Sequence, residues 1–248
     1  MITGAVDRYK GMEITDLSQF SQSEEEFEKQ LIKSLEQWEK DKIRSVQIFF
    51  NPPYCHLMNV VSRFGFYFHH ASREKGGYVL LCRWLDRSTH DKIPAYADHY
   101  VGVGGAVINQ KGEILLIQEV RSPEPKPWKL PGGFMDPKET ISQAVEREVF
   151  EETGVKAKFY GLLGLREQLK FRYDSTDFYI VCLLLVNDDE AQEIDIKDKR
   201  EVSGAQWVPL ADLTSNGEAA KYRMFPNAYM FISGLNKIYT AQGIEGLK

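Results

Sequence analysis

The chain has 248 residues, and its 31 Lys and Arg residues against 36 Asp and Glu residues give a formal net charge of −5. Hydrophobic residues make up 43% of the chain and charged residues 27%, which is the composition of an ordinary soluble globular protein. No apolar run reaches the ~18 residues of a membrane-spanning helix, and a mildly acidic chain is not drawn to nucleic acid. The sequence therefore predicts neither a membrane nor a nucleic-acid partner.

The cysteines and the N-terminal residues point to a compartment. Cys55, Cys82 and Cys182 show no C-x-x-C spacing, and their odd number argues against a disulfide framework. We expect them to be buried free thiols in a reducing compartment. Acids such as Glu24 and Glu25 among the first thirty residues are unlike a signal or transit peptide. The sequence therefore predicts a cytoplasmic protein, unless a presequence is missing.

Residues 1–95 are expected to form a small α+β domain with the order strand–helix–strand–helix–strand–strand. A helix is predicted over residues 23–40, where Ser23 and Glu26 can form a capping box and apolar residues recur at helical spacing, at Phe27, Leu31, Leu35 and Trp38. Strands are predicted at residues 44–50, 65–71 and 78–85, with a short helix between Pro53 and Arg63.

A linker at residues 86–97 leads into a second domain, residues 96–248. Its first two strands are expected to form a hairpin around the turn at residues 110–112. A Pro-rich loop, a short extended segment at residues 128–130 and a glycine turn follow. We predict further elements from the hydrophobic pattern: strands at residues 100–108, 113–119, 159–166, 178–185 and 205–208, and helices at residues 141–152 and 226–239.

The helix over residues 141–152 carries the most informative side chains. At 100° per residue, Glu148, Glu151 and Glu152 fall within roughly a third of its circumference. Three converging carboxylates need positive charge, and Arg147 alone does not balance them. A hard divalent ion such as Mg²⁺ would, whereas the alternative is a solvated acidic face.

The residues before this helix fit the same interpretation. Thr140 and Gln143 match a capping box. The pair Gly132-Gly133 has no Cβ, so a backbone carbonyl can approach the ion that the acids would bind. If the loop folds back, Glu139 comes within reach of the guanidinium fork of Arg147, which would fix the geometry of the carboxylates.

The complete pattern from Gly133 to Val155 is G-x5-E-x7-R-E-V-x-E-E-x-G-V, with nine specified positions in twenty-three residues. It resembles the signature of the Nudix hydrolases. The resemblance implies an α/β/α sandwich around a mixed sheet, preceded here by the α+β N-terminal domain. It also implies Mg²⁺- or Mn²⁺-dependent hydrolysis of a nucleoside diphosphate linked to another moiety, with metal ions that neutralise the diphosphate and activate water.

The resemblance also assigns roles to residues. Glu148 and Glu152 would be the principal metal ligands, with the carbonyl of Gly132 as a third. Glu201 stands where the family commonly has a further acid, and a plain loop carboxylate is the equal alternative. The catalytic set would consist of an orienting pair and a residue that either binds a further ion or acts as the base: Arg147 with Glu139, and Glu151.

The similarity continues outside the signature, at residues 65–71 (GFYFHHA), 101–104 and 128–133 (WKLPGG). These segments resemble a eukaryotic ADP-ribose/NADH pyrophosphatase group that has an extra N-terminal domain. The group includes plant cytosolic Nudix hydrolases and the animal fibroblast-growth-factor antisense protein. The resemblance implies ADP-ribose or NADH as substrate and makes a homodimer plausible.

Substrate-binding residues are expected near the cleft of the second domain. Aromatic side chains could hold a ring, and polar ones could hold phosphate or ribose oxygens. The alternative for each aromatic residue is a place in the core. The candidates are Trp128, Phe171, Tyr173 and Phe178 for the ring, and Arg166, Gln168, Lys170 and Arg172 for the oxygens.

Two motifs imitate other sites. Residues 102–105 contain three glycines but lie inside a predicted strand, so we expect close packing of the backbone there and no phosphate loop. His69 and His70 are adjacent in a strand, so we expect their side chains to face opposite sides and to bind no metal.

Two other functions stay open at this stage. One is hydrolysis of RNA caps or dinucleoside polyphosphates, although the net acidity argues against an RNA groove. The other is a non-catalytic nucleotide-sensing or scaffold protein that uses its N-terminal domain. The intact set of acids favours an enzyme over the second alternative.

Overall fold

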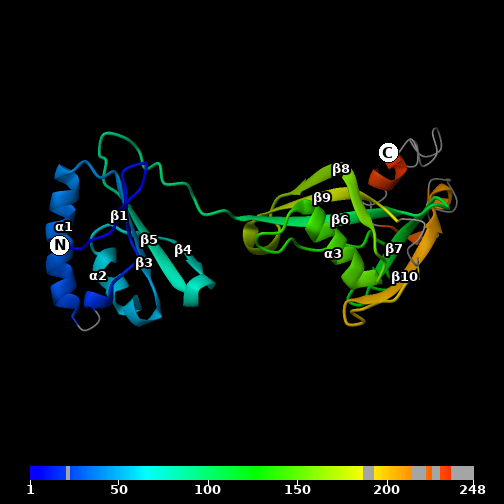
Figure 1. Cartoon of the computed structure of the whole chain (residues 1–248), viewed down its shortest axis with the longest axis horizontal. Coiled ribbons are helices and arrows are strands. Elements are labelled where there is room, and N and C mark those ends of the chain that lie inside the picture. The colour runs from blue at the N-terminus through cyan, green and yellow to red at the C-terminus, as the bar shows by residue number, and fades with distance from the viewer. Residues whose placement is uncertain (21–22, 187–192, 214–221, 225–229, 236–248) are drawn as a thin grey trace. The chain divides into compact units, whose positions relative to one another are not determined.

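The computed structural model describes residues 1–20, 23–186, 193–213, 222–224 and 230–235 (Figure 1). The chain forms two compact units, which we call the first unit (Met1–Ala97) and the second unit (Asp98–Lys248). Each unit contains one five-stranded sheet. Among the described residues, no helix has the length and apolarity needed to cross a membrane.

The sheet of the first unit contains one parallel pair, β2 with β3, and its other pairs are antiparallel. The predicted strands at residues 44–50, 65–71 and 78–85 are present with slightly different ends. The order across the sheet is β1 (Ala5–Val6), β2 (Gly11–Ile14), β3 (Ser45–Phe50), β5 (Tyr78–Trp84) and β4 (Tyr67–Ser72).

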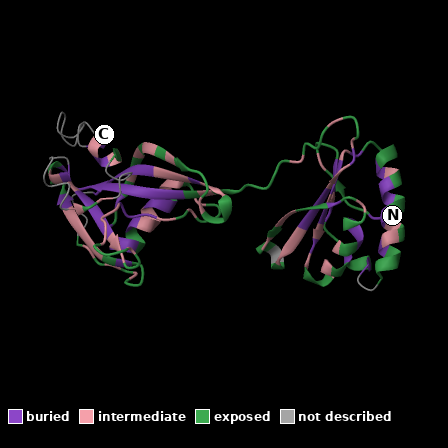
Figure 2. Ribbon diagram, turned by 180° about the vertical axis from the view of Figure 1, so that it is seen from behind, coloured by how far each residue is buried: buried purple, intermediate pink, exposed green. Residues whose placement is uncertain are grey.

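The predicted first helix is confirmed as α1 (Glu24–Lys40). The Ser23 hydroxyl caps it by accepting the N–H of Glu26 at 3.1 Å. The side chains of the predicted apolar stripe are buried, and Figure 2 shows α1 buried along one face and exposed along the other. The expected short helix consists of a 3-10 helix, Pro52–Leu57, followed by α2 (Met58–Ser62).

The expectation that His69 and His70 face opposite sides is wrong. A bulge in β4 between Phe68 and His70 breaks the alternation, and the two Nδ1 atoms lie 2.7 Å apart. His69 Nε2 donates to the carbonyl oxygen of Pro94 at 2.7 Å, so its Nδ1 accepts the proton of His70 Nδ1. His70 also stacks on Tyr96, with ring centroids 4.1 Å apart. The histidine pair therefore ties the end of the first unit to β4.

The second unit is a sandwich around a mixed sheet in which β6 and β9 are parallel. Helix α3 (Ile141–Thr153) packs on one face, and the helical residues 230–235 pack on the other through Ile232 and Leu235. The rest of the helix predicted at residues 226–239 lies outside the described residues. The strand order is β10 (Val202–Pro209), β7 (Glu113–Glu119), β6 (His99–Ile108), β9 (Thr176–Leu185) and β8 (Lys158–Gln168).

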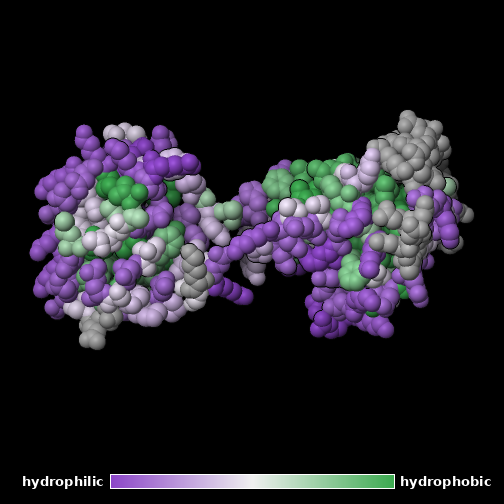
Figure 3. Space-filling view, viewed as in Figure 1, coloured by the Kyte–Doolittle hydropathy of each residue, from purple (hydrophilic) through white to green (hydrophobic). Residues whose placement is uncertain are grey.

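Strand β8 lies at the edge of this sheet and carries exposed apolar side chains. Leu162 is 61% exposed and Leu165 is 58% exposed. Figure 3 shows apolar surface gathered over β8 and β9 on the side in view. Two bulges in β8, next to Gly161 and Gly164, shift its register against β9.

The predicted hairpin of β6 and β7 is closed only at its turn, where Ile108 pairs with Ile114. Beyond that pair the strands diverge, and residues 128–135 lie between them. Lys129 exchanges two backbone hydrogen bonds with Ile117 of β7, at 2.9 and 3.0 Å. On the other side, residues 131, 133 and 135 bond to residues 105, 103 and 101 of β6. This insertion carries the predicted glycine turn into the middle of the unit.

The glycines of residues 102–105 serve close packing, as predicted. A Cβ on Gly104 would lie 2.1 Å from the hydroxyl of Tyr179, and one on Gly105 would lie 2.7 Å from Val149 of α3. These positions allow an aromatic ring and a helix to approach the strand.

Replacing Gly104 by alanine should lower the free energy of unfolding by about 1–3 kcal/mol, because the half-buried ring of Tyr179 must move. Urea unfolding measures the loss. Gly161→Ala is the matched control, since a Cβ there meets no atom within 4 Å. An equal loss in the two variants would contradict this account of the packing.

Candidate active site

Helix α3, which carries the acidic side chains, is capped at both ends. The predicted capping box is present: Gln143 N–H donates to the Thr140 hydroxyl at 3.2 Å, and Thr140 N–H donates to the Gln143 side chain at 2.9 Å. The helix ends at Gly154, whose φ of 73° is left-handed. Val149 is buried against the sheet, and Glu152 is buried beside the inserted segment.

The glycine pair lies directly against these acids. Gly132 N–H donates to Glu152 Oε2 at 2.6 Å. Its φ is 149°, and a Cβ there would stand 2.1 Å from the carbonyl oxygen of Val103, so only glycine fits. A Cβ on Gly133 would lie 2.8 Å from both carboxylate oxygens of Glu148. The missing side chains therefore leave the backbone in contact with the carboxylates.

Arg147 organises the acids around it. Its Nε and Nη2 donate to the two oxygens of Glu139, at 2.7 and 2.9 Å, which is the bidentate fork that the sequence suggested. Its Nη1 donates to Glu148 at 2.8 Å and to Glu151 at 3.1 Å, and Nη2 also reaches the carbonyl of Phe134. These hydrogen bonds lower the pKa of Glu139 to about 2.

The acids on the inner face of α3 have raised pKa values. Burial raises the pKa of Glu152 to about 7, against the opposing effects of the Lys129 charge and the Gly132 N–H. Burial also raises the pKa of Glu148, and the charges of Glu151 and Glu201 add to the shift. Glu201 therefore lies within electrostatic range of Glu148. Its backbone carbonyl accepts the N–H of residue 120, at the end of β7.

Lys129 is a second cation near Glu152. Its Nζ donates to Glu119 Oε1 at 2.5 Å and lies 3.5 Å from the carbonyl oxygen of Gly132. The side chain of Lys129 is 20% exposed and that of Glu119 is 42% exposed. The acids of this site thus have three positively polarised partners: the Lys129 ammonium, the Arg147 guanidinium and the Gly132 amide.

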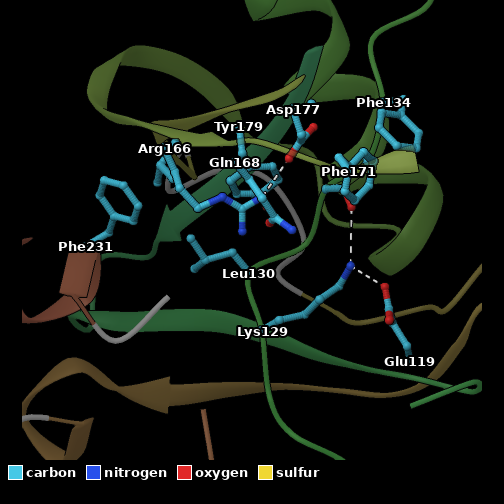
Figure 4. A pocket seen from close by; sticks show the side chains of 14 residues that line it. Glu119, Lys129, Leu130, Phe134, Arg166, Gln168, Phe171, Asp177, Tyr179 and Phe231 are labelled. Atoms are coloured by element: carbon cyan, nitrogen blue, oxygen red, sulfur yellow. Dashed lines mark hydrogen bonds and ion pairs between the residues drawn. The ribbon is translucent and has the colours of Figure 1, made fainter. Parts of the chain in front are cut away.

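A pocket of about 480 Å³ adjoins the glycine pair (Figure 4). Its walls are largely apolar and include Leu130, Phe171 and Phe231. On its lining, Arg166 Nη2 donates to Asp177 Oδ2 at 2.7 Å, and Asp177 is almost fully buried. The pocket therefore combines a slot for a flat apolar group with a buried ion pair, next to the acids of α3.

The chain matches the sequence patterns of two known domain families. The sequence pattern of the NUDIX domain matches residues 98–228. The chain belongs to the Nudix hydrolase family. A second pattern, described as a Nudix hydrolase domain, matches residues 2–85, so it covers most of the first unit.

Curated Nudix relatives match both units. Nudix hydrolase 8 of Arabidopsis thaliana is 32% identical over 88% of this chain and 58% of its own length. Nudix hydrolase 7 of the same plant is 31% identical over 91% of this chain and 78% of its own length. Human nucleoside diphosphate-linked moiety X motif 6 is 35% identical over 64% of this chain and 49% of its own length. The chain thus spans about half to three quarters of these relatives.

The residues of this Nudix site fit a hard divalent cation by their chemistry. Glu148, Glu152 and the Gly132 carbonyl offer only oxygen donors, and the bare Cα of Gly133 leaves space beside Glu148. In the described part of the chain, no three His, Cys, Asp or Glu side chains are disposed to hold an ion. One oxygen of Glu148 accepts from Arg147 instead, and one of Glu152 accepts from the Gly132 amide.

The structure brings only part of the expected substrate set together. Arg166, Gln168 and Phe171 line the pocket beside the Nudix helix. Trp128 does not line it; its ring packs against the hydrophobic core and borders a separate hollow. Tyr173 is 92% exposed. The remaining candidates are not lining residues of this pocket: Lys170, Phe178, which stacks on His99, and Arg172, whose guanidinium lies over the rings of the lining residues Phe134 and Phe171.

Four residues at this site were not among the predicted site residues. Asp177 and Tyr179 line the pocket from β9, and Glu119 and Lys129 line it from β7 and the inserted segment. Lys129 does stand immediately before the Leu-Pro-Gly-Gly turn, so its position next to the glycines was available from the sequence. The other three reach the site only through strand pairing.

Proposed function

We propose that this Nudix hydrolase is a Mg²⁺- or Mn²⁺-dependent diphosphatase that cleaves ADP-ribose, NADH or both. The products would be AMP plus ribose 5-phosphate or nicotinamide mononucleotide. The observation that carries the proposal is the joint placement of the signature acids, the glycine pair and the pocket, all within one unit. The name of the human relative, a nucleoside diphosphate-linked moiety protein, supports the same substrate class.

The residues of the signature would share the work as follows. Glu148, Glu152 and the Gly132 carbonyl would hold one cation, and Glu151 or Glu201 would hold a further one. When bound, the cations neutralise the diphosphate and generate the nucleophile from water. Hydrolysis adds the water oxygen to one phosphorus and breaks its bond to the bridging oxygen, which leaves two phosphate monoesters.

Arg147 and Glu151 have separate parts in this proposal. Arg147 holds Glu139, Glu148 and Glu151 at hydrogen-bond distance, so it fixes the carboxylates before a substrate arrives. Glu151 is 56% exposed, so water can reach the carboxylate, and it would take a proton from the attacking water. Either Glu151 or another carboxylate of the site would act as the base.

The pocket would take the ring of the substrate. The apolar side chains of Leu130, Phe171 and Phe231 suit a flat heteroaromatic group. Gln168 and the Arg166–Asp177 pair offer hydrogen-bond donors and acceptors to its polar edge or to a ribose. Adenine and nicotinamide both present such an edge.

A cytoplasmic location is part of the proposal. The three cysteines Cys55, Cys82 and Cys182 are free thiols, and Cys82 and Cys182 are buried. Free thiols suit a reducing compartment.

A substrate panel tests the proposed activity. We expect the full chain with Mn²⁺ to release AMP from ADP-ribose or NADH, and to lose that activity with EDTA, as measured by ion-pair chromatography. The panel also contains a capped RNA and a dinucleoside tetraphosphate. Turnover of these two alone would replace the proposed substrates with the alternative class. No turnover of any member by folded protein would contradict the diphosphatase assignment and favour a nucleotide-sensing role.

A further inference from the structure

Lys129 is the feature of this site that the proposed chemistry does not use. Its ammonium lies between Glu119, at 2.5 Å, and the Gly132 carbonyl, at 3.5 Å (Figure 4). Its charge also acts on the buried carboxylate of Glu152. The ammonium thus supplies positive charge close to Glu119 and Glu152. It also lies near the carbonyl oxygen of Gly132, which is one of the oxygens that a divalent cation would bind.

Two arginines near the site, Arg147 and Arg166, are already engaged by carboxylates. Arg147 donates to three carboxylates, those of Glu139, Glu148 and Glu151, and to one backbone carbonyl. Arg166 is paired with the buried Asp177. Lys129 has one close carboxylate partner, Glu119, which is partly exposed, and an ammonium on a four-carbon stem can redirect its three donors.

We propose that Lys129 is an exchangeable counter-ion of the metal site. Without a divalent cation it balances Glu119 and Glu152, and when the cation binds it turns to the diphosphate of the substrate. The second half of this inference rests on the substrate of the proposed function, whereas the first half rests only on its metal site.

Repulsion between the Lys129 ammonium and a bound divalent cation would drive this exchange of partners. A divalent ion bound to the Gly132 carbonyl and Glu152 would share the carbonyl with the ammonium, whose charge also acts on Glu152. The two cations would therefore repel each other at short range in a partly buried site. The ammonium then needs a new anion. It lines the same pocket as Arg166, and the diphosphate of a bound substrate is the anion that enters there. The lysine therefore opposes metal binding but favours substrate binding.

The first test measures Mn²⁺ affinity without substrate, by electron paramagnetic resonance of free Mn²⁺. A neighbouring charge shifts proton binding to a carboxylate by one to three pKa units, so Lys129→Met should tighten Mn²⁺ binding at least about tenfold. Lys129→Arg keeps the charge and should bind Mn²⁺ like the wild type. Lys158→Met is the matched control, because Lys158 pairs with Glu146 at 3.2 Å and does not line the pocket. Unchanged or weaker Mn²⁺ binding in Lys129→Met overturns the proposal.

The second test measures ADP-ribose hydrolysis at saturating Mn²⁺. Loss of a charge-assisted contact to the diphosphate should raise KM about tenfold in Lys129→Met, with kcat changed less than about twofold. Lys129→Arg should restore most of the affinity. A fall in kcat without a change in KM would show that Lys129 only maintains the site, and would overturn the exchange. If the wild type hydrolyses no substrate, the proposed function fails, while the Mn²⁺ measurement still decides the first half of this inference.

Discussion

Replacing Glu152 by glutamine is expected to reduce turnover of ADP-ribose by at least about 100-fold, since loss of a residue that only orients a metal ligand already costs about 10–100-fold. Glu152 lies against the Gly132 amide and is 7% exposed, so the isosteric amide keeps the shape of the site and removes one anionic oxygen donor. Steady-state kinetics with Mn²⁺ measures the loss. Glu36→Gln, at an exposed position of α1, is the control. Wild-type turnover in Glu152→Gln would mean that this residue is no metal ligand.

The same substitution should stabilise the protein at high pH when EDTA is present. Burial raises the pKa of Glu152 in the folded state to about 7, so above pH 7 the fold holds a buried carboxylate that the unfolded chain ionises more easily. This destabilisation is full above pH 7, falls as the pH drops, and disappears below pH 4.5. Glutamine removes it, and the gain at pH 8 is on the order of 3 kcal/mol.

Urea unfolding at pH 5 and pH 8 separates this effect from a general change in packing. Most of the gain should be absent at pH 5, where Glu152 is largely protonated in the folded state. An equal gain at both pH values would show that the charge is not its cause. Greater stability combined with lost activity would identify Glu152 as a residue kept for chemistry at the expense of the fold.

The sequence predicted those elements whose signals are local. The stripe of Phe27, Leu31 and Leu35 and the cap at Ser23 specify α1 without any other part of the chain. The capping box at Thr140 does the same for α3. These signals act within a few residues, because a helix satisfies its own backbone hydrogen bonds.

The errors came from contacts between distant segments. Strands β6 and β7 were expected to form a hairpin, but they pair only next to its turn, because residues 128–135 enter between them and form backbone hydrogen bonds with both strands. The bulge beside His70 is likewise set by pairing with β5, and it reverses the side to which a histidine points. The alternation of side chains along a strand predicts neither an inserted segment nor a bulge, because both depend on the neighbouring strand.

The candidate site also combines a local contact that the sequence predicts with contacts between distant segments that it does not. Glu139 and Arg147 lie eight positions apart, and a short loop is enough to join them, so the signature predicts their contact. The pocket is lined by residues of β6, β7, β8, β9, the inserted segment and the loop between β8 and β9, together with Phe231, and its composition depends on strand register. Trp128 was therefore predicted near the cleft although it does not line the described pocket, whereas Asp177, which does, was not considered.

Replacing Asp177 by leucine is expected to lower the free energy of unfolding by about 3 kcal/mol, because it leaves the guanidinium of Arg166 without its carboxylate in a largely buried place. Asp177 has 5% of its side chain exposed and Arg166 has 26%, and they are joined at 2.7 Å. The Arg166 guanidinium also lies over the Tyr179 ring, 5.1 Å from its centroid, so it has little room to reach water. Urea unfolding of the single variant measures the loss.

The double variant Arg166→Met with Asp177→Leu decides whether the ion pair serves stability or binding. Apolar side chains of similar volume often replace a buried ion pair without loss, so most of the ~3 kcal/mol should return. ADP-ribose affinity should not return, since the pocket has then lost the donor and the acceptor that would contact the polar edge of the substrate. If stability and KM both recover, the pair has no part in recognition. If neither the free energy of unfolding nor KM recovers, the fold itself requires the ion pair, and the ion pair maintains the shape of the pocket.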